Sequence, residues 1–235
     1  MAARSYGQYC GLTRAVELIG ERWAMLIVRD LLVGPRRYTD LRAGLPRIPT
    51  NILSVRLKEL QQAGVVRRVP LAHCGLVYEL TAYGRELEPI VTALSRWGFQ
   101  AMGTPAEGDV VTGDSLTMAL RTAFQADAAA SLPPAVYELR IGPVTLRADV
   151  TADGLRIAQL APPAPPAAGA VALGDPDVVV DAGPGIRDVI AGTLTAADAV
   201  DAGVLRVVAG DAALLDRFAA TFHIPLTRTP QKETA

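Results

Sequence analysis

The feature that most constrains the fold is a helix with one polar face, followed directly by two short strands. Residues 49–64 read PTNILSVRLKELQQAG, and at about 100° per residue Leu53, Leu57 and Leu60 fall on one face. The opposite face carries no acidic residue and comprises Asn51, Ser54, Val55, Lys58 and Gln62. Residues 65–71 and 76–81 then alternate like two strands joined by a turn. This pattern predicts an exposed helix beside a two-stranded ribbon.

Residue types at its two ends define the limits of this helix. Thr50 is a candidate N-cap, because a threonine hydroxyl can accept a hydrogen bond from the first turn. Gly64 is a candidate terminator, because glycine readily adopts the left-handed conformation that ends many helices. We therefore expect the helix to run from about residue 50 to residue 63.

Other helical patterns surround this unit. Apolar spacing and the stop signals that follow it predict helices over 12–19, over 23–33, briefly from Tyr38, and over 83–102. An apolar stripe along the last helix comprises Leu87, Ile90, Val91, Leu94, Trp97 and Ala101. Because such a stripe is too apolar to face water, we expect a homodimer that also uses the helix at 12–19. The order of these elements is that of a winged helix-turn-helix module with a dimerisation helix.

The charges divide the chain into two unlike halves. Residues 1–103 carry 14 Lys and Arg against 8 Asp and Glu, a net charge of +6, whereas residues 104–235 carry 9 against 16, a net charge of −7. A basic half is typical of a protein that binds a polyanion. We predict a DNA-binding and dimerisation domain over 1–103, a linker over 104–112 and a second domain over 113–228.

The basic half offers side chains of the types that contact double-stranded DNA. Base edges are the expected partners of Thr50, Asn51, Ser54 and Lys58, with Val55 against a thymine methyl group. Phosphates are the expected partners of Arg36, Arg37, Arg67, Arg68 and His73. Arg56 lies nearer the buried face, so we expect it to hold a neighbouring helix by an ion pair and to reach a phosphate only with its tip. The alternative is that all these residues form a solvated basic surface on a helical domain and do not bind DNA.

The basic half of the chain resembles the HxlR family of bacterial winged helix-turn-helix regulators. The likeness covers residues 8 to 102 and includes CGLTRAVELIGERW, the GPRRYTDL turn, the helix NILSVRLKEL and the strand YELT. It implies a homodimer that binds operator DNA, and we expect it to act as a repressor. Some members of this family sense oxidants or electrophiles through a cysteine placed like Cys10. The alternative for Cys10 is a small buried apolar residue.

The acidic half predicts an α+β domain, so the whole chain is α+β. Strands are expected within 136–160, 171–183 and 205–210, with helices from about Ser115, from about Pro184 and after Asp211. Asp114 and Asp211 are the candidate caps. The ending resembles the sterol carrier protein family at Gly192-Thr193-Leu194, Ala199, Gly203, Leu205, Gly210-Asp211 and Phe218.

This second resemblance implies a tunnel for an apolar small molecule. The candidates to line it are Leu116, Leu120, Phe124, Ile186, Ile190, Leu194, Phe218 and Phe222. The alternative is that these side chains fill an ordinary core, since apolar helical stripes usually pack on apolar sheets without leaving a cavity.

Enzymatic activity is not expected, although GDSL at 113–116 is how some esterases present a nucleophilic serine. Such a serine needs a histidine base, and the residue three before His223 is Ala220 instead of the usual aspartate. Ser115 is therefore predicted to lie in the first turn of a capped helix. The competing function is a small-molecule carrier or esterase whose winged domain makes protein contacts only.

Cofactors and membrane contacts are not expected either. Cys10 and Cys74 form no CxxC pair, and two histidines offer no metal-ligand spacing, so neither a metal site nor a cofactor is predicted. Apolar runs of membrane-spanning length are absent, and residues 1–11 have no apolar segment typical of a signal peptide. We therefore expect a cytoplasmic protein.

Overall fold

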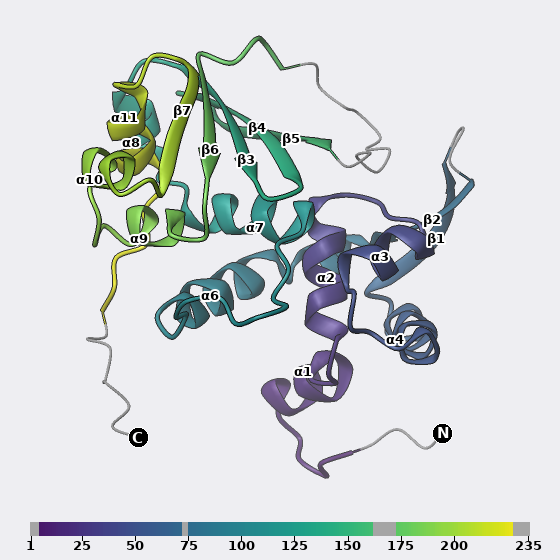
Figure 1. Ribbon diagram of the computed structural model, residues 1–235. Coiled ribbons are helices and arrows are strands. Elements are labelled where there is room, and N and C mark those ends of the chain that lie inside the picture. The colour runs from purple at the N-terminus through teal and green to yellow at the C-terminus, as the bar shows by residue number, and fades with distance from the viewer. Residues whose placement is uncertain (1–4, 72–74, 162–172, 228–235) are drawn as a thin grey trace. The chain divides into compact units, whose positions relative to one another are not determined.

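The computed structural model of the 235-residue chain describes residues 5–71, 75–161 and 173–227 (Figure 1). By its contacts the chain divides into two compact units, the first ending at Val91 and the second beginning at Thr92. This division lies earlier in the chain than the predicted boundary at residue 103, because the C-terminal part of the helix predicted over 83–102 packs with the second unit.

The first unit has the predicted order of elements. Its helices are α1 (Gly11–Ile19), α2 (Ala24–Val33), α3 (Tyr38–Gly44), α4 (Thr50–Gln62) and α5 (Ala82–Arg85), and its strands are β1 (Val66–Leu71) and β2 (Gly75–Leu80). The strands pair antiparallel, with Arg68 opposite Tyr78. Leu53, Leu57 and Leu60 are almost completely buried. The inner face of α4 is therefore the face that periodicity predicted.

The two ends of α4 differ in how well they were predicted. Gly64 has a φ of +71°, and its amide donates to the carbonyl of Gln61, so it ends the helix as expected. Thr50 is not the cap. Pro49 occupies that position without a side-chain hydrogen bond, and Thr50 is the first helical residue. Its hydroxyl therefore does not satisfy an amide of the first turn.

The long helix predicted over 83–102 is two helices. After α5 the chain turns at residues 86–87, and α6 spans Glu88–Phe99. Pro89 explains the break, because it has no amide hydrogen to donate to the carbonyl of Arg85 and its ring crowds the preceding turn. The amide of Val91 resumes the helical pattern by donating to Leu87. The second of the two helices, α6, therefore begins at Glu88 and ends at Phe99, before the predicted end at Met102.

The second unit is a five-stranded sheet with helices. Its elements are α7 (Gly113–Ala123), α8 (Ala126–Ser131), β3 (Ala135–Ile141), β4 (Val144–Thr151), β5 (Gly154–Ala161), β6 (Val178–Ala182), α9 (Ile186–Ile190), α10 (Ala196–Asp201), β7 (Leu205–Gly210) and α11 (Leu214–Thr221). The strand order is β5-β4-β3-β6-β7, and only the β3–β6 pair is parallel. The helices and one face of the sheet enclose a common apolar core. The prediction of an α+β fold is confirmed.

Several local predictions in this unit need correction. Thr112, not Asp114, caps α7: its hydroxyl accepts from the amide of Ser115 at 3.2 Å. Asp211 accepts from the amide of Ala213 at 2.9 Å and so caps the turn that leads into α11. Helix α8 was not predicted, since ADAAAS has no large apolar residue whose spacing could indicate a helical face.

Candidate nucleic-acid interface

The outer face of α4 is open to solvent over most of its length. Thr50, Asn51, Ser54 and Lys58 are exposed, and Val55 is half-buried. The three leucines of the inner face anchor the helix, so its orientation in this unit is set by packing. Amide, hydroxyl and ammonium groups on one face can donate to and accept from base edges in the major groove.

Tyr38 buttresses the beginning of α4. Its hydroxyl donates to the carbonyl of Thr50 at 2.8 Å and lies 3.3 Å from the hydroxyl of Ser54. Ser54 in turn donates to the same carbonyl at 3.1 Å. Sequence periodicity does not predict this role of Tyr38, because the contact joins the first residue of α3 to the first turn of α4. The Ser54 hydroxyl retains acceptor capacity for a base edge but already has a donor bond.

Arg56 forms the predicted ion pair with a segment outside its own helix. Its guanidinium lies 3.0 Å from the carboxylate of Glu21 and also pairs with Glu59, and its side chain is only 16% exposed. Glu21 belongs to the segment between α1 and α2. Arg56 therefore ties α4 to the preceding helices.

Arg36 does not lie on the surface as predicted. It is 2% exposed, and its guanidinium donates to the carbonyl of Pro35 at 2.9 Å. Its backbone forms an antiparallel bridge with Tyr78, with N to O distances of 2.9 and 2.7 Å in the two directions. Arg36 thus extends the ribbon as a third short segment, and this pairing buries the side chain. A phosphate cannot reach it in this conformation.

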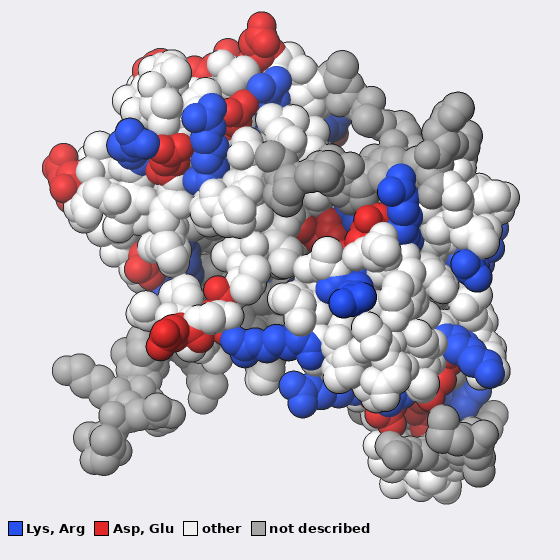
Figure 2. All heavy atoms as spheres, turned by 45° about the vertical axis from the view of Figure 1, so that its right-hand side comes forward, with Lys and Arg blue, Asp and Glu red and all other residues white. Residues whose placement is uncertain are grey.

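The remaining phosphate candidates are distributed between the start of α3 and the ribbon. Arg37 is half-buried, and its amide donates to the carboxylate of Asp40 at 2.9 Å. The Arg67 side chain is 63% exposed and pairs with Glu79 at 2.6 Å, whereas the guanidinium of Arg68 lies 5.7 Å from the Tyr78 ring centroid. His73 and Cys74 lie outside the described residues. Figure 2 shows Lys and Arg side chains in several separate groups, some of them next to carboxylates.

Two of the exposed arginines that were not predicted as candidates lie near the turn between α3 and α4. Arg42 lies in the last turn of α3, and Arg47 lies between α3 and α4. Only the Gly44 and Pro46 stop signals of this segment entered the prediction. The density of arginine on either side of those stops was the signal that could have identified them.

Cys10 is exposed and occupies the N-cap position of α1. Hydrogen bonding by the backbone of Thr13, then by the backbone of Leu12 and the side chain of Thr13, lowers the pKa of the thiol. A helix N-terminus favours a thiolate, because its amide groups point toward the negative charge. The alternative of a small buried apolar residue is therefore wrong for Cys10.

Three residues of the predicted stripe on α6 face solvent in the single chain, whereas Val91 of the same stripe is 5% exposed and belongs to the core. Ile90, Leu94 and Trp97 are 48%, 50% and 74% exposed. On α1, Leu12 is 74% exposed and Val16 is 40% exposed. Single exposed apolar residues are ordinary, but three at i, i+4 and i+7 form a continuous face along a helix.

The candidates for a tunnel lining are core residues in this structure. Leu116, Leu120, Ile186, Ile190, Phe218 and Phe222 are buried, and Phe124 and Leu194 pack partly buried against the same core. The Phe218 ring centroid lies 4.7 Å from that of Phe222 and 5.5 Å from that of Tyr137. These contacts fill the space between the sheet and α11 with aromatic side chains. A pocket of about 840 Å³ lies elsewhere in this unit, and none of the eight candidates lines it.

Ser115 has the role of a capping residue. Its hydroxyl donates to the carbonyl of Thr112 at 2.9 Å and accepts from the amide of Thr112 at 2.9 Å. The predicted first-turn position is confirmed, and both functions of the hydroxyl are used in the turn. Among the described residues, no group of three or more His, Cys, Asp or Glu side chains could hold a metal ion. A search of the same residues finds no helix long and apolar enough to span a membrane.

The first unit has the arrangement of a winged helix-turn-helix protein: helices α2 to α4 are followed by the β1–β2 ribbon. The family model described as HxlR-like helix-turn-helix matches residues 18–105. YvaP of Bacillus subtilis (strain 168), named as an uncharacterized HTH-type transcriptional regulator, is 41% identical over 86 residues, which are 36% of this chain and 80% of YvaP. The chain belongs to the HxlR-like helix-turn-helix family.

Other relatives agree with this assignment. The HTH-type transcriptional regulator YodB of Bacillus subtilis (strain 168) is 34% identical over 88 residues, covering 37% of this chain and 79% of YodB. The solved structure named as the redox regulator HypR in its oxidized form is 31% identical, covers 38% of this chain and 94% of that chain, and has a TM-score of 0.36. By their names, the relatives YvaP and YodB are transcriptional regulators, and no family of enzymes is indicated by them.

Proposed function

We propose that this protein is a transcriptional regulator that binds double-stranded operator DNA as a homodimer through α4 and the β1–β2 ribbon. The observation that carries the proposal is the two-sided character of α4, with three buried leucines behind an exposed, acid-free polar face. This arrangement supports a recognition helix, because a rigid helix can present its side chains to base edges in the major groove. We expect the bound dimer to repress transcription.

The proposed contacts fall into two groups. Asn51 is suited to an adenine edge and Lys58 to a guanine edge or a nearby phosphate, with Thr50, Ser54 and Val55 beside them. Arg68 and Arg67 on the ribbon, with Arg37 at the start of α3, would contact phosphates. Arg36 and Arg56 are not among the proposed contacts. The Arg36 side chain is buried, and the Arg56 side chain is held in an ion pair.

The homodimer is proposed from the exposed stripe of Ile90, Leu94 and Trp97 on α6, with Leu12 and Val16 of α1 as a second apolar contact. Pairing this face with a second copy would remove it from water. A two-fold dimer would also place two recognition helices about 34 Å apart, the length of one turn of DNA. Each helix could then enter one half-site of the same operator.

For the second unit we propose a fold of the sterol carrier protein type. The order α9, α10, β7 and α11 after a sheet covered by helices on one face supports this proposal. The eight former tunnel candidates lie within or against one packed apolar core, so they do not support a ligand there. A ligand site in this unit has to be sought elsewhere.

The test of DNA binding uses Lys58→Ala and Arg68→Ala. We expect each change to weaken binding to the DNA upstream of the protein's own coding sequence by about tenfold, without loss of folding. Loss of the Arg68 phosphate contact should also reduce the salt slope, d log K/d log [salt], by about one per monomer. Fluorescence anisotropy of a labelled duplex at several salt concentrations measures both quantities.

The matched control is Arg156→Ala. Arg156 is a partly exposed arginine on β5 of the second unit, paired with Asp149. The Arg156→Ala substitution removes the same charge from a surface that is not proposed to contact DNA. If all three variants bind like the parent protein, or if all three weaken binding equally, the proposed interface is incorrect.

We propose redox or electrophile sensing by Cys10 as a second function, supported by its exposure and its lowered pKa at the N-cap of α1. In a Cys74→Ser background, alkylation of Cys10 by iodoacetamide should reach half its maximal rate at a lower pH than that of a cysteine in an unfolded peptide. Hydrogen peroxide should then change operator affinity. A Cys10→Ser protein should not respond, and an equal response of that variant would exclude Cys10 as the sensor.

A further inference from the structure

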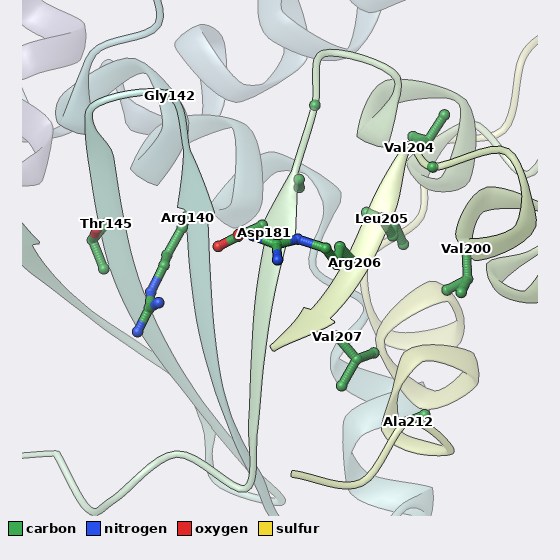
Figure 3. A pocket seen from close by; sticks show the side chains of 13 residues that line it. Arg140, Gly142, Thr145, Asp181, Val200, Val204, Leu205, Arg206, Val207 and Ala212 are labelled. Carbon is green, nitrogen blue, oxygen red and sulfur yellow. Dashed lines mark hydrogen bonds and ion pairs between the residues drawn. The ribbon is translucent and has the colours of Figure 1, made fainter. Parts of the chain in front are cut away.

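The pocket of about 840 Å³ in the second unit does not form one binding site (Figure 3). Arg140, Asp181 and Arg206 of its lining are cross-strand neighbours, so they share the face of the sheet opposite the apolar core. The Arg206 side chain reaches toward Asp181, whereas the Arg140 side chain extends away from it. Val204 and Val207 of the same lining pack against the core instead. The charged and the apolar groups therefore do not face a common space.

Helix α6 has two different sides. Its exposed stripe consists of Ile90, Leu94 and Trp97. At about 100° per residue, Phe99 lies on the side of the helix opposite this stripe, and Arg96 and Gln100 lie between the two. By its contacts the chain from Thr92 onward belongs to the second unit. The side of α6 away from the stripe is therefore the side that meets the second unit.

Phe99 anchors the last turn of α6 in the second unit. Its side chain is 9% exposed and belongs to the same apolar core as the aromatic cluster of Phe218 and Phe222. The guanidinium carbon of Arg187 lies 5.2 Å from the centroid of the Phe99 ring, within the range of a cation–π contact. Burial of the ring holds this end of α6 by the hydrophobic effect.

Arg96 binds the end of a neighbouring helix. Its Nε donates to the carbonyl of Thr122 at 3.1 Å, and Thr122 is the last residue but one of α7. The last four carbonyls of an α-helix have no amide partner within the helix, and a cation is favoured near them. Arg96 therefore supplies a donor that α7 itself does not have.

Gln100, directly after α6, joins the helix to a segment far away in the sequence. Its Nε2 donates to the carbonyl of Pro225 at 3.0 Å. Its Oε1 accepts from the amide of Thr227 at 2.8 Å and lies 3.4 Å from the Thr227 hydroxyl. One carboxamide thus uses its donor and its acceptor on backbone groups of the same segment.

The segment that Gln100 binds is itself fixed in the second unit. The amide of Ile224 donates to the carbonyl of Ile190 at 2.9 Å, and the Ile224 side chain is 5% exposed. Leu226 packs partly buried against the core. Gln100 is therefore held by backbone that the core has already placed.

These contacts matter because α6 is short. It has 12 residues, and isolated helices of this length are only marginally stable in water. A helix that is ordered before two chains meet does not add its ordering entropy to the free energy of association. Contacts on the side away from the stripe can therefore strengthen a dimer in which they take no part.

We propose that Gln100 is a positioning residue for dimerisation: with Arg96 and Phe99 it holds α6 against the second unit, so that the exposed stripe is preformed for a second copy of this chain. This proposal rests on the proposed homodimer. The second unit then contributes to operator binding without contacting DNA, because it orders the helix through which the two chains pair.

The first test measures the order of α6 in a single chain. Hydrogen exchange followed by mass spectrometry is applied to the full-length Leu94→Asp protein, in which the dimer contact is removed. Adding Gln100→Ala should speed exchange of the α6 amides at least about threefold, because both bonds to residues 225 and 227 are lost. The matched control is Ser95→Ala, which removes a half-buried polar group from the same helix and should leave exchange unchanged.

A double-mutant cycle tests whether Gln100 acts through the distant segment. Thr227→Pro removes only the backbone donor and should also speed exchange in α6, although residue 227 is 127 positions away from Gln100. Since the two changes break the same contact, their effects should not add. A general loss of structure at either residue would give additive effects.

The second test measures association with Leu94 intact. Sedimentation equilibrium should show a dimer dissociation constant about tenfold higher for Gln100→Ala than for the parent, comparable to the net value of one or two hydrogen bonds. The Ser95→Ala protein should dimerise like the parent.

A monomeric parent protein would overturn the homodimer and this proposal with it. With a dimeric parent, three results would overturn this proposal alone: equal exchange in the Gln100→Ala and Ser95→Ala proteins, additive effects of the Gln100 and Thr227 changes, or an unchanged dissociation constant for Gln100→Ala. The DNA contacts of Lys58 and Arg68 are tested separately from all of these measurements.

Discussion

Replacing Leu94 by aspartate is expected to make the protein monomeric and to weaken its binding to operator DNA by about 100-fold or more. Leu94 lies at the centre of the exposed α6 stripe, with Ile90 one turn before it and Trp97 one turn after it. Two aspartates near a two-fold axis would place charge in an apolar contact and repel each other. A monomer then binds one half-site and loses the gain from a second, linked contact.

Analytical ultracentrifugation at micromolar concentration and anisotropy with the upstream duplex measure these two effects. The control is Leu160→Asp on β5, because Leu160 is 44% exposed, close to the 50% of Leu94, but lies outside the stripe. The control should remain dimeric and bind DNA normally. A parent protein that is already monomeric, or a Leu94→Asp protein that remains dimeric, would show that this face is not the dimer contact.

The Phe218→Ala variant should lose about 3–5 kcal/mol of unfolding free energy in the second unit. Phe218 is 1% exposed and contacts both Tyr137 of β3 and Phe222, so its removal leaves a cavity between the sheet and α11. Neighbouring rings on two different elements limit how far the site can collapse. Urea unfolding followed by circular dichroism measures the change.

Phe124→Ala is the matched control for this core. Phe124 is only partly buried, and its ring centroid lies 6.0 Å from that of Phe222. A smaller loss than at Phe218 is expected, because part of the ring already contacts water. Equal losses in the two variants, or a loss below about 1 kcal/mol at Phe218, would show that the aromatic cluster is not tightly packed.

Local sequence patterns were sufficient to predict those features that depend on a single helix or strand. The period of Leu53, Leu57 and Leu60 predicted the buried face of α4, and Gly64 predicted its end, because both signals act within a few residues. The position of Arg56 near that face also predicted its ion pair. Pro89 also carried a local signal for the break between α5 and α6, but the apolar stripe across it masked that signal.

The sequence by itself determined the order of elements in the first unit, the polar face of α4 and the α+β character of the second unit. Only the tertiary structure decided that Arg36 is buried, because its bridge to Tyr78 joins segments far apart in the chain. It also decided that Arg140, Asp181 and Arg206 share one row, since this depends on β6 inserting between β3 and β7. Side-chain periodicity specifies which face of an element is apolar, but strand pairing specifies which residues meet across a sheet.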